Sequence, residues 1–82
     1  MTGVASFVII ADADADLLAR VGATLNLLNV MPRAFHLETR PEGTAAVRAS
    51  IDCADAQAEL VARKLWRLTA VRDVTLEYRD GS

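Results

Sequence analysis

The sequence has little of several residue types on which specialised proteins depend. It has a single cysteine, Cys53, which excludes an internal disulfide. Aromatic residues make up only 5% of the chain, and no apolar run approaches the roughly 20 residues that cross a bilayer. The N-terminus lacks the charged start and long apolar segment of a signal peptide. We therefore expect a cytoplasmic protein with no membrane segment.

Clustered positive charge is also missing. The nine basic residues are scattered along the chain, and the formal net charge is −2. This distribution argues against a nucleic-acid surface and against a basic membrane-binding helix. With 82 residues the chain is long enough for one domain, which we expect to be ordered over about residues 4–79. Because alanine supplies much of the 52% hydrophobic fraction, the core should be thin.

A strand, an acidic turn and a helix are predicted at the start of the chain. Apolar residues occur at both the even and the odd positions of residues 4–11, so they would lie on both faces of a strand. This favours a central strand covered on at least one face. Asp12, Asp14 and Asp16 follow directly, and we expect Asp12 or Asp14 to accept hydrogen bonds from the first N–H groups of the helix. The helix itself is indicated by an apolar stripe of Leu17, Leu18, Val21, Leu25 and Leu28.

Three residues indicate how this first helix packs and ends. Gly22 lies within it at a cost of about 1 kcal/mol relative to alanine, and we expect it to permit close packing on the sheet. Asn29 is a good left-handed terminator. Pro32 prevents the helix from continuing.

Two alternating segments predict a hairpin after the helix. Residues 45–53 alternate apolar and polar side chains, and Gly43 before them is available for a positive φ. Residues 33–40 are flanked by prolines, which suits an edge strand. Their alternation sets Phe35, Leu37 and Thr39 against His36, Glu38 and Arg40.

A second helix and a last strand complete the predicted order. The helix begins at Ala54 and Asp55, with Asp55 or Asp52 as the expected cap, and residues 71–79 form the strand. The expected core residues of this second helix are Leu60, Val61, Leu65 and Leu68. Two right-handed β-α-β crossovers joined by a hairpin predict a ferredoxin-like α+β sandwich, with two helices on one face of a four-stranded antiparallel sheet. Strands one and three would lie in the centre.

The second strand is then left at an edge of the sheet. Exposed edges are either blunted or paired with another chain. Arg33, Glu38 and Arg40 partly blunt this one, whereas pairing with a second copy would enlarge the thin core. We therefore predict a homodimer, with the contact at Phe35, His36, Leu37 and Glu38.

No residue pattern indicates catalysis or a metal site. The only histidine, His36, has no candidate nucleophile, and Cys53 fits a small buried residue better than a ligand. Calcium loops with the spacing of Asp12, Asp14 and Asp16 also carry a glycine and a later glutamate, which are missing here. We expect no catalysis, no metal and no cofactor.

Several segments resemble an ACT domain, a small regulatory module that binds amino acids. They are the runs Val8-Ile9-Ile10-Ala11-Asp12 and Leu17-Leu18-Ala19-Arg20-Val21, the turn 28–33, and the pattern from Lys64 to Val74. Within that group the chain looks most like the short regulatory subunits of acetolactate synthase. The resemblance spans nearly the whole chain and rests on hydrophobic motifs.

The resemblance implies an effector site between the first turn, the first helix and a partner's second strand. Its residues here would be Asp12, Ala13, Asp14, Ala15, Asp16, Asn29, Met31 and Arg33. Members that bind an amino acid generally have a glycine and an asparagine in the turn where this chain has Asn29 and Met31. The acidic first turn would repel a ligand carboxylate and attract an ammonium group. The chain thus either binds a small amino acid or works by docking alone.

Two functions follow from the resemblance. The first is a non-catalytic regulatory subunit that dimerises and then binds and activates a thiamine-diphosphate-dependent acetolactate synthase large subunit in branched-chain amino-acid biosynthesis. The alternative is a free-standing amino-acid sensor that regulates another enzyme. A small enzyme on the same scaffold lacks a convergent set of polar residues, although fold alone does not decide function.

Overall fold

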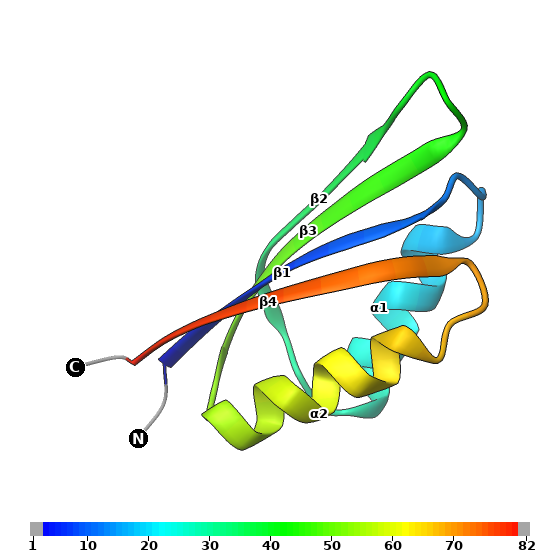
Figure 1. The fold of residues 1–82 in the computed structure, drawn as a ribbon. Helices are drawn as coiled ribbons and strands as arrows, with labels where there is room; N and C mark the ends of the chain where they lie inside the picture. The colour runs from blue at the N-terminus through cyan, green and yellow to red at the C-terminus, as the bar shows by residue number, and fades with distance from the viewer. Residues whose placement is uncertain (1–2, 81–82) are drawn as a thin grey trace.

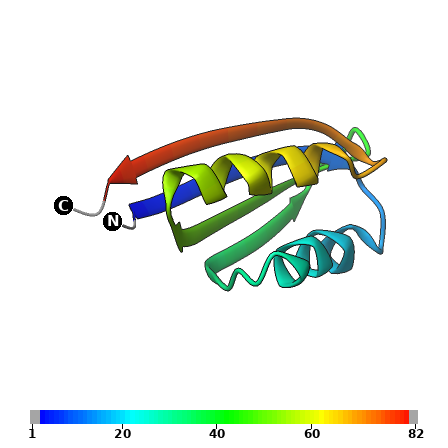
Figure 2. The same cartoon turned by 90° about the horizontal axis from the view of Figure 1, so that it is seen from below.

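A computed structural model describes residues 3–80 of the chain. Its elements are β1 (Gly3–Asp12), α1 (Leu17–Leu27), β2 (Pro32–Thr39), β3 (Thr44–Cys53), α2 (Asp55–Trp66) and β4 (Val71–Asp80) (Figure 1). The four strands form one antiparallel sheet in the order β2-β3-β1-β4. Both helices lie on the same face of the sheet (Figure 2). The ferredoxin-like fold predicted from the sequence is confirmed, including the central places of β1 and β3.

The core lies between the helices and one face of the two central strands. Phe7 pairs with Ala49 on β3 and Leu76 on β4, so these side chains share the helix-facing side of the sheet. Alternate residues of β1 and β3 are buried on this side. The buried side chains are Ala5, Phe7, Ile9, Ala11, Leu17, Val21, Leu25, Val30, Ala45, Ala46, Val47, Ala49, Ile51, Cys53, Ala58, Val61 and Leu65. Seven of these residues are alanine or cysteine-sized, as the composition predicted.

Two turns depend on residues with a positive φ. Asn29 ends α1 with φ of 57°, and Gly43 has φ of 85° in the hairpin between β2 and β3. Asparagine and glycine tolerate this left-handed region better than other residues, because it crowds a larger side chain against the backbone. Both sequence predictions are confirmed, and both turns lead into β2 or out of it.

The predicted helix caps are wrong. α1 begins after Asp16 and α2 after Ala54, and neither N-cap makes a side-chain hydrogen bond to its helix. Asp12 belongs to β1, and Asp52 lies on β3. Both carboxylates pair instead with arginines on neighbouring strands, because strand geometry directs them to the sheet surface away from the helix ends. The Asp14 carboxylate accepts a hydrogen bond at 2.9 Å from the N–H of Asp16, one residue before α1 starts.

The predicted apolar stripes also need correction. Leu18 is 46% exposed, since it follows the buried Leu17 by about 100° around the helix and leaves the covered side. On α2 the buried set is Ala58, Val61 and Leu65, while the expected Leu60 is half-buried. Leu68 is also half-buried and lies beyond the end of α2 at Trp66. A Cβ at Gly22 would meet no atom within 4 Å, so this glycine does not serve close packing on the sheet.

The described segments also bear on a membrane role. Neither α1 nor α2, the helices within residues 3–80, is long and apolar enough to cross a bilayer. β4 extends to Asp80, which is the last described residue. Gly81 and Ser82 lie outside the described residues.

Candidate functional site

A hollow of about 420 Å³ lies where the turn between β1 and α1 meets the end of β2. We call it the edge hollow, and its lining residues are Ala13, Asp14, Ala15, Leu18, Leu37 and Thr39. Three of them belong to the predicted effector site, and Leu37 belongs to the predicted dimer edge. The structure therefore brings parts of both predicted sites together at the β2 edge of the sheet.

Backbone hydrogen bonds fix the turn that forms one wall of the edge hollow. Asp12 N–H donates to the carbonyl of Ala70, and Ala13 N–H donates to the carbonyl of Gly43, both at 2.9 Å. Leu17 N–H donates to the carbonyl of Asp14 at 3.0 Å. The turn is thus tied to both neighbouring connections of the sheet, and Asp14 is held at the rim of the hollow.

The edge hollow combines apolar walls with one carboxylate. Leu18, Leu37 and two alanines supply the apolar surface, and Asp14 is exposed at the rim. Such a site suits either an aliphatic group that carries an ammonium or the side chains of another protein. A carboxylate ligand would need a cation that the lining of this single copy does not contain.

The other two aspartates of the acidic turn lie outside the edge hollow. The Asp12 carboxylate is 2.6 Å from Nε of Arg72 at the start of β4, so it is directed to the opposite side of the turn. Asp16 is exposed at the N-cap of α1. Within residues 3–80 no group of three or more His, Cys, Asp or Glu side chains is placed to hold a metal ion.

The remaining predicted effector residues lie at the far end of α1. Asn29 and Met31 line a separate hollow of about 90 Å³ with Asn26 and Val30. Because α1 has 11 residues, about 16 Å of helix separates this hollow from the acidic turn. Arg33 points to Asp52 on β3, with Nη1 and Oδ1 3.4 Å apart. Within one copy, the two halves of the predicted effector site do not meet.

The predicted dimer residues lie on β2, and β2 is an edge strand. Phe35 and Leu37 are half-buried and pack against the core cluster. His36 and Glu38 are exposed on the face of the sheet away from the helices, where His36 pairs in register with Arg48. The edge placement is confirmed, and pairing with a second copy stays a prediction.

Cys53 is a buried thiol at the end of β3. Its burial raises the pKa of the thiol, and the nearby carboxylates of Asp52 and Asp55 raise it further. The carbonyl of Cys53 accepts a hydrogen bond at 3.0 Å from the Tyr78 hydroxyl, which links the ends of β3 and β4. A protonated, covered thiol is a poor nucleophile, so Cys53 is a packing residue as predicted.

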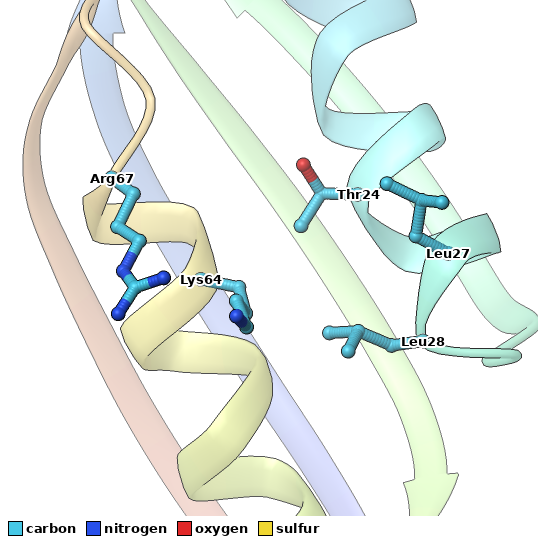
Figure 3. Close-up of a pocket in the computed structure, with 5 residues that line it drawn as sticks. All are labelled: Thr24, Leu27, Leu28, Lys64 and Arg67. Carbon is cyan, nitrogen blue, oxygen red and sulfur yellow. The ribbon is translucent and has the colours of Figure 1, made fainter.

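A second concave surface lies between the helices and was not predicted. We call it the helix groove, a space of about 300 Å³ lined by Thr24, Leu27 and Leu28 from the end of α1 and by Lys64 and Arg67 from the end of α2 (Figure 3). Its two walls come from segments about 40 residues apart in sequence. No local motif could signal it. Leu18 was likewise missed for the edge hollow, because its spacing matched the core stripe.

The fold places this chain among structures with ACT-type architecture. The ACT domain of GTP pyrophosphokinase from Chlorobium tepidum superimposes with a TM-score of 0.81 at 13% identity, covering 94% of this chain and all of that domain. The C-terminal domain of the MgtC protein from Mycobacterium tuberculosis gives 0.74 at 12% identity, covering 96% and 89%. A homoserine dehydrogenase from Thiobacillus denitrificans gives 0.74 at 14% identity, covering 95% of this chain and 17% of that enzyme.

These similarities are structural. No family model matches the sequence, and no curated protein matches it either. At identities of 12–14% the likeness shows a shared ferredoxin-like, ACT-type fold. This fold occurs in proteins of several kinds, so the function of this chain must be argued from its own surfaces.

Proposed function

We propose that this chain is a non-catalytic regulatory subunit that forms a homodimer and activates a thiamine-diphosphate-dependent acetolactate synthase large subunit. The observation that carries the proposal is the unpaired β2 edge, beside a hollow lined by residues of the ACT-like effector position. The sequence resemblance to short acetolactate synthase regulatory subunits supplies the particular partner. In this proposal catalysis belongs to the large subunit.

Homodimer formation is supported by the surface next to β2. An eight-residue edge strand presents backbone groups that require a partner or water. Leu18 is 46% exposed beside that edge. Gly22 lies on the same helix with open space around it, which leaves room for a second backbone to approach α1 closely. A second copy would complete the sheet and cover these residues.

An antiparallel pairing of two β2 strands would also reunite the predicted effector residues. In such a pair the start of one strand lies beside the end of the other. Arg33 of the second copy would then approach Thr39 and the edge hollow of the first. The composite site would have the Asp14 carboxylate for an ammonium group and, once Arg33 leaves Asp52 of its own copy, a guanidinium for a carboxylate, with an aliphatic wall between them.

Mixing the purified subunits tests the proposed function. We expect the acetolactate synthase rate of the large subunit from the same organism to rise with added chain and to saturate at a fixed stoichiometry. Heat-unfolded chain serves as the control and should leave the rate unchanged. An unchanged rate across the titration, with folded chain confirmed by circular dichroism, would reject the partnership.

The second candidate, a free-standing amino-acid sensor, is favoured by the carboxylate at the rim of an apolar hollow. Thermal unfolding in the presence of branched-chain amino acids, serine, glycine and aromatic amino acids separates the two functions. A ligand at ten times its Kd stabilises the folded state by RT ln 11, or about 1.4 kcal/mol. A stabilising ligand together with no effect on the large subunit would select the sensor.

A further inference from the structure

The helix groove has an apolar floor and a cationic rim. Leu27 and Leu28 lie on one wall, and Lys64 and Arg67 lie on the other, with the Arg67 side chain running along its own helix (Figure 3). Leu27 is 86% exposed, the highest value among the large exposed hydrophobic residues of the described chain. The surface therefore combines a leucine that is costly to leave in water with two cations.

Within residues 3–80 the cations at the groove take part in no ion pair. α1 contains no acidic residue, and α2 contains none after Glu59. Among residues 3–80 the ion pairs involve Arg33 and Arg72, and neither lies at the groove. Cations in the last turn of α2 favour its own C-terminal carbonyls, which accounts for some of this charge. That effect does not explain why they lie opposite the exposed Leu27 and the half-buried Leu28.

α1 carries apolar residues on the side that faces solvent, beside the polar Arg20 and Asn26, as well as on the side that faces the core. Leu18, Ala19, Ala23 and Leu27 are all exposed. Large apolar side chains outside the core-facing stripe of a helix favour a second covered surface. Leu18 and Leu27 are nine positions apart in the sequence, which places them about 180° apart around the helix at 100° per residue. A dimer that covers Leu18 through the β2 edge would leave the helix groove free.

We propose that the helix groove is a docking site for an acidic segment of the partner enzyme, with an apolar side chain seated against Leu27 and Leu28 and carboxylates beside Lys64 and Arg67. This inference rests on the proposed function and names the surface that the large subunit contacts. Charge complementarity selects the occupant, because opposite charge at the rim of an apolar contact steers association and fixes its register. Self-association would be served by the opposite flank of α1.

A small ligand fits the helix groove less well than a protein segment. Ligand sites use a few fixed polar groups to orient what they bind. Here the Thr24 hydroxyl already donates to the carbonyl of Arg20 at 3.0 Å, and the remaining polar groups are two long flexible side chains. The wall at Leu27 is open to solvent. These features match a contact that another protein surface completes.

Binding of groove variants to the acetolactate synthase large subunit tests the inference. The variants are the double change Lys64→Glu with Arg67→Glu, and Leu27→Ser. Arg63→Glu is the control for charge reversal, because it reverses one of the same kind of charge at an exposed position of α2 outside the groove. We expect the double variant and Leu27→Ser each to raise the Kd about ten-fold or more, and Arg63→Glu to change it less than about three-fold. Added salt should weaken native binding more than binding of the double variant.

Four other results would contradict the inference, each in a different way. Absence of binding by the native chain would overturn the proposed function and this inference together. Equal Kd values for all variants, or an equal loss with Arg63→Glu, would overturn the groove alone and leave the regulatory function standing. A change in the oligomeric mass of the double variant would assign the groove to a second copy. Saturable binding of 4-methylpentanoate that the double variant loses would assign it to a small carboxylate.

Discussion

Replacing Leu18 with serine tests which side of α1 contacts the second copy in the dimer. The side chain lines the edge hollow and is 46% exposed, so a dimer through β2 would remove the remaining surface from water. The change shortens the side chain and introduces a hydroxyl that stays solvated in the monomer. It should weaken self-association while the fold persists.

The size of the effect follows from the exposed fraction. Complete burial of a leucine side chain is worth about 1.5–3 kcal/mol. With 46% left to cover, dimerisation gains about 1 kcal/mol per copy and about 2 kcal/mol for the two copies. That loss corresponds to about a 30-fold increase in the dimer dissociation constant. The monomer loses a further contribution of about 1 kcal/mol from the part already buried.

Sedimentation equilibrium over a range of concentrations measures the dissociation constant directly. Leu27→Ser is the matched control, because it removes the same groups from the other flank of the same helix, where the side chain is 86% exposed. We expect Leu27→Ser to leave the dimer constant within about two-fold of the native value. Equal weakening by both variants, or no weakening by Leu18→Ser, would refute the assignment of the β2 flank to the dimer.

Three further predictions concern the fold. Asn29 has φ of 57°, so Asn29→Ala should lower the free energy of unfolding in urea by about 1 kcal/mol. Asn29→Gly should leave this free energy nearly unchanged, because glycine tolerates a positive φ. Equal losses for the two variants would show that φ is not the cause. Tyr78→Phe should cost about 1 kcal/mol, because the Cys53 carbonyl loses its donor, and an unchanged urea midpoint would contradict this. Because burial raises the pKa of the Cys53 thiol, the thiol ionises at a lower pH in the unfolded chain than in the folded one. The free energy of unfolding should therefore fall as the pH rises above about 8.5, and it should fall more in the native chain than in Cys53→Ala. Parallel pH profiles for the two proteins would exclude the thiol as the source.

The element order and sheet topology were predictable because hydrophobic period and turn chemistry agree along this chain. The alternation of Phe35 and Leu37 with polar residues identified an edge strand, and Asn29 and Gly43 marked two turns by their tolerance of positive φ. These are local signals. Each depends on residues within a few positions of each other.

The helix caps were mispredicted because local sequence does not reveal tertiary competition for a side chain. Asp12 looked like a cap for α1, but Arg72 lies sixty residues later and takes its carboxylate across the sheet surface. Asp52 is taken in the same way by Arg33. A strand that continues one residue further than expected turns a capping residue into a sheet residue.

The candidate site was predicted in part. The acidic turn and the β2 edge do meet at Asp14 and Leu37, whereas Asn29 and Met31 lie at the opposite end of α1. Sequence reasoning about a single copy cannot place residues that only a second copy would bring together. The helix groove was missed for a related reason, since Leu27 and Lys64 are neighbours only through the packing of two helices.

The pairing of β2 with a second copy is the central claim, and amide hydrogen exchange measures it most directly. The sheet has two edge strands, so β4 (Val71–Asp80) is an internal reference for β2 (Pro32–Thr39). We predict that protection of β2 amides increases with protein concentration while protection of β4 amides does not. Equal protection of the two strands at every concentration would contradict the account.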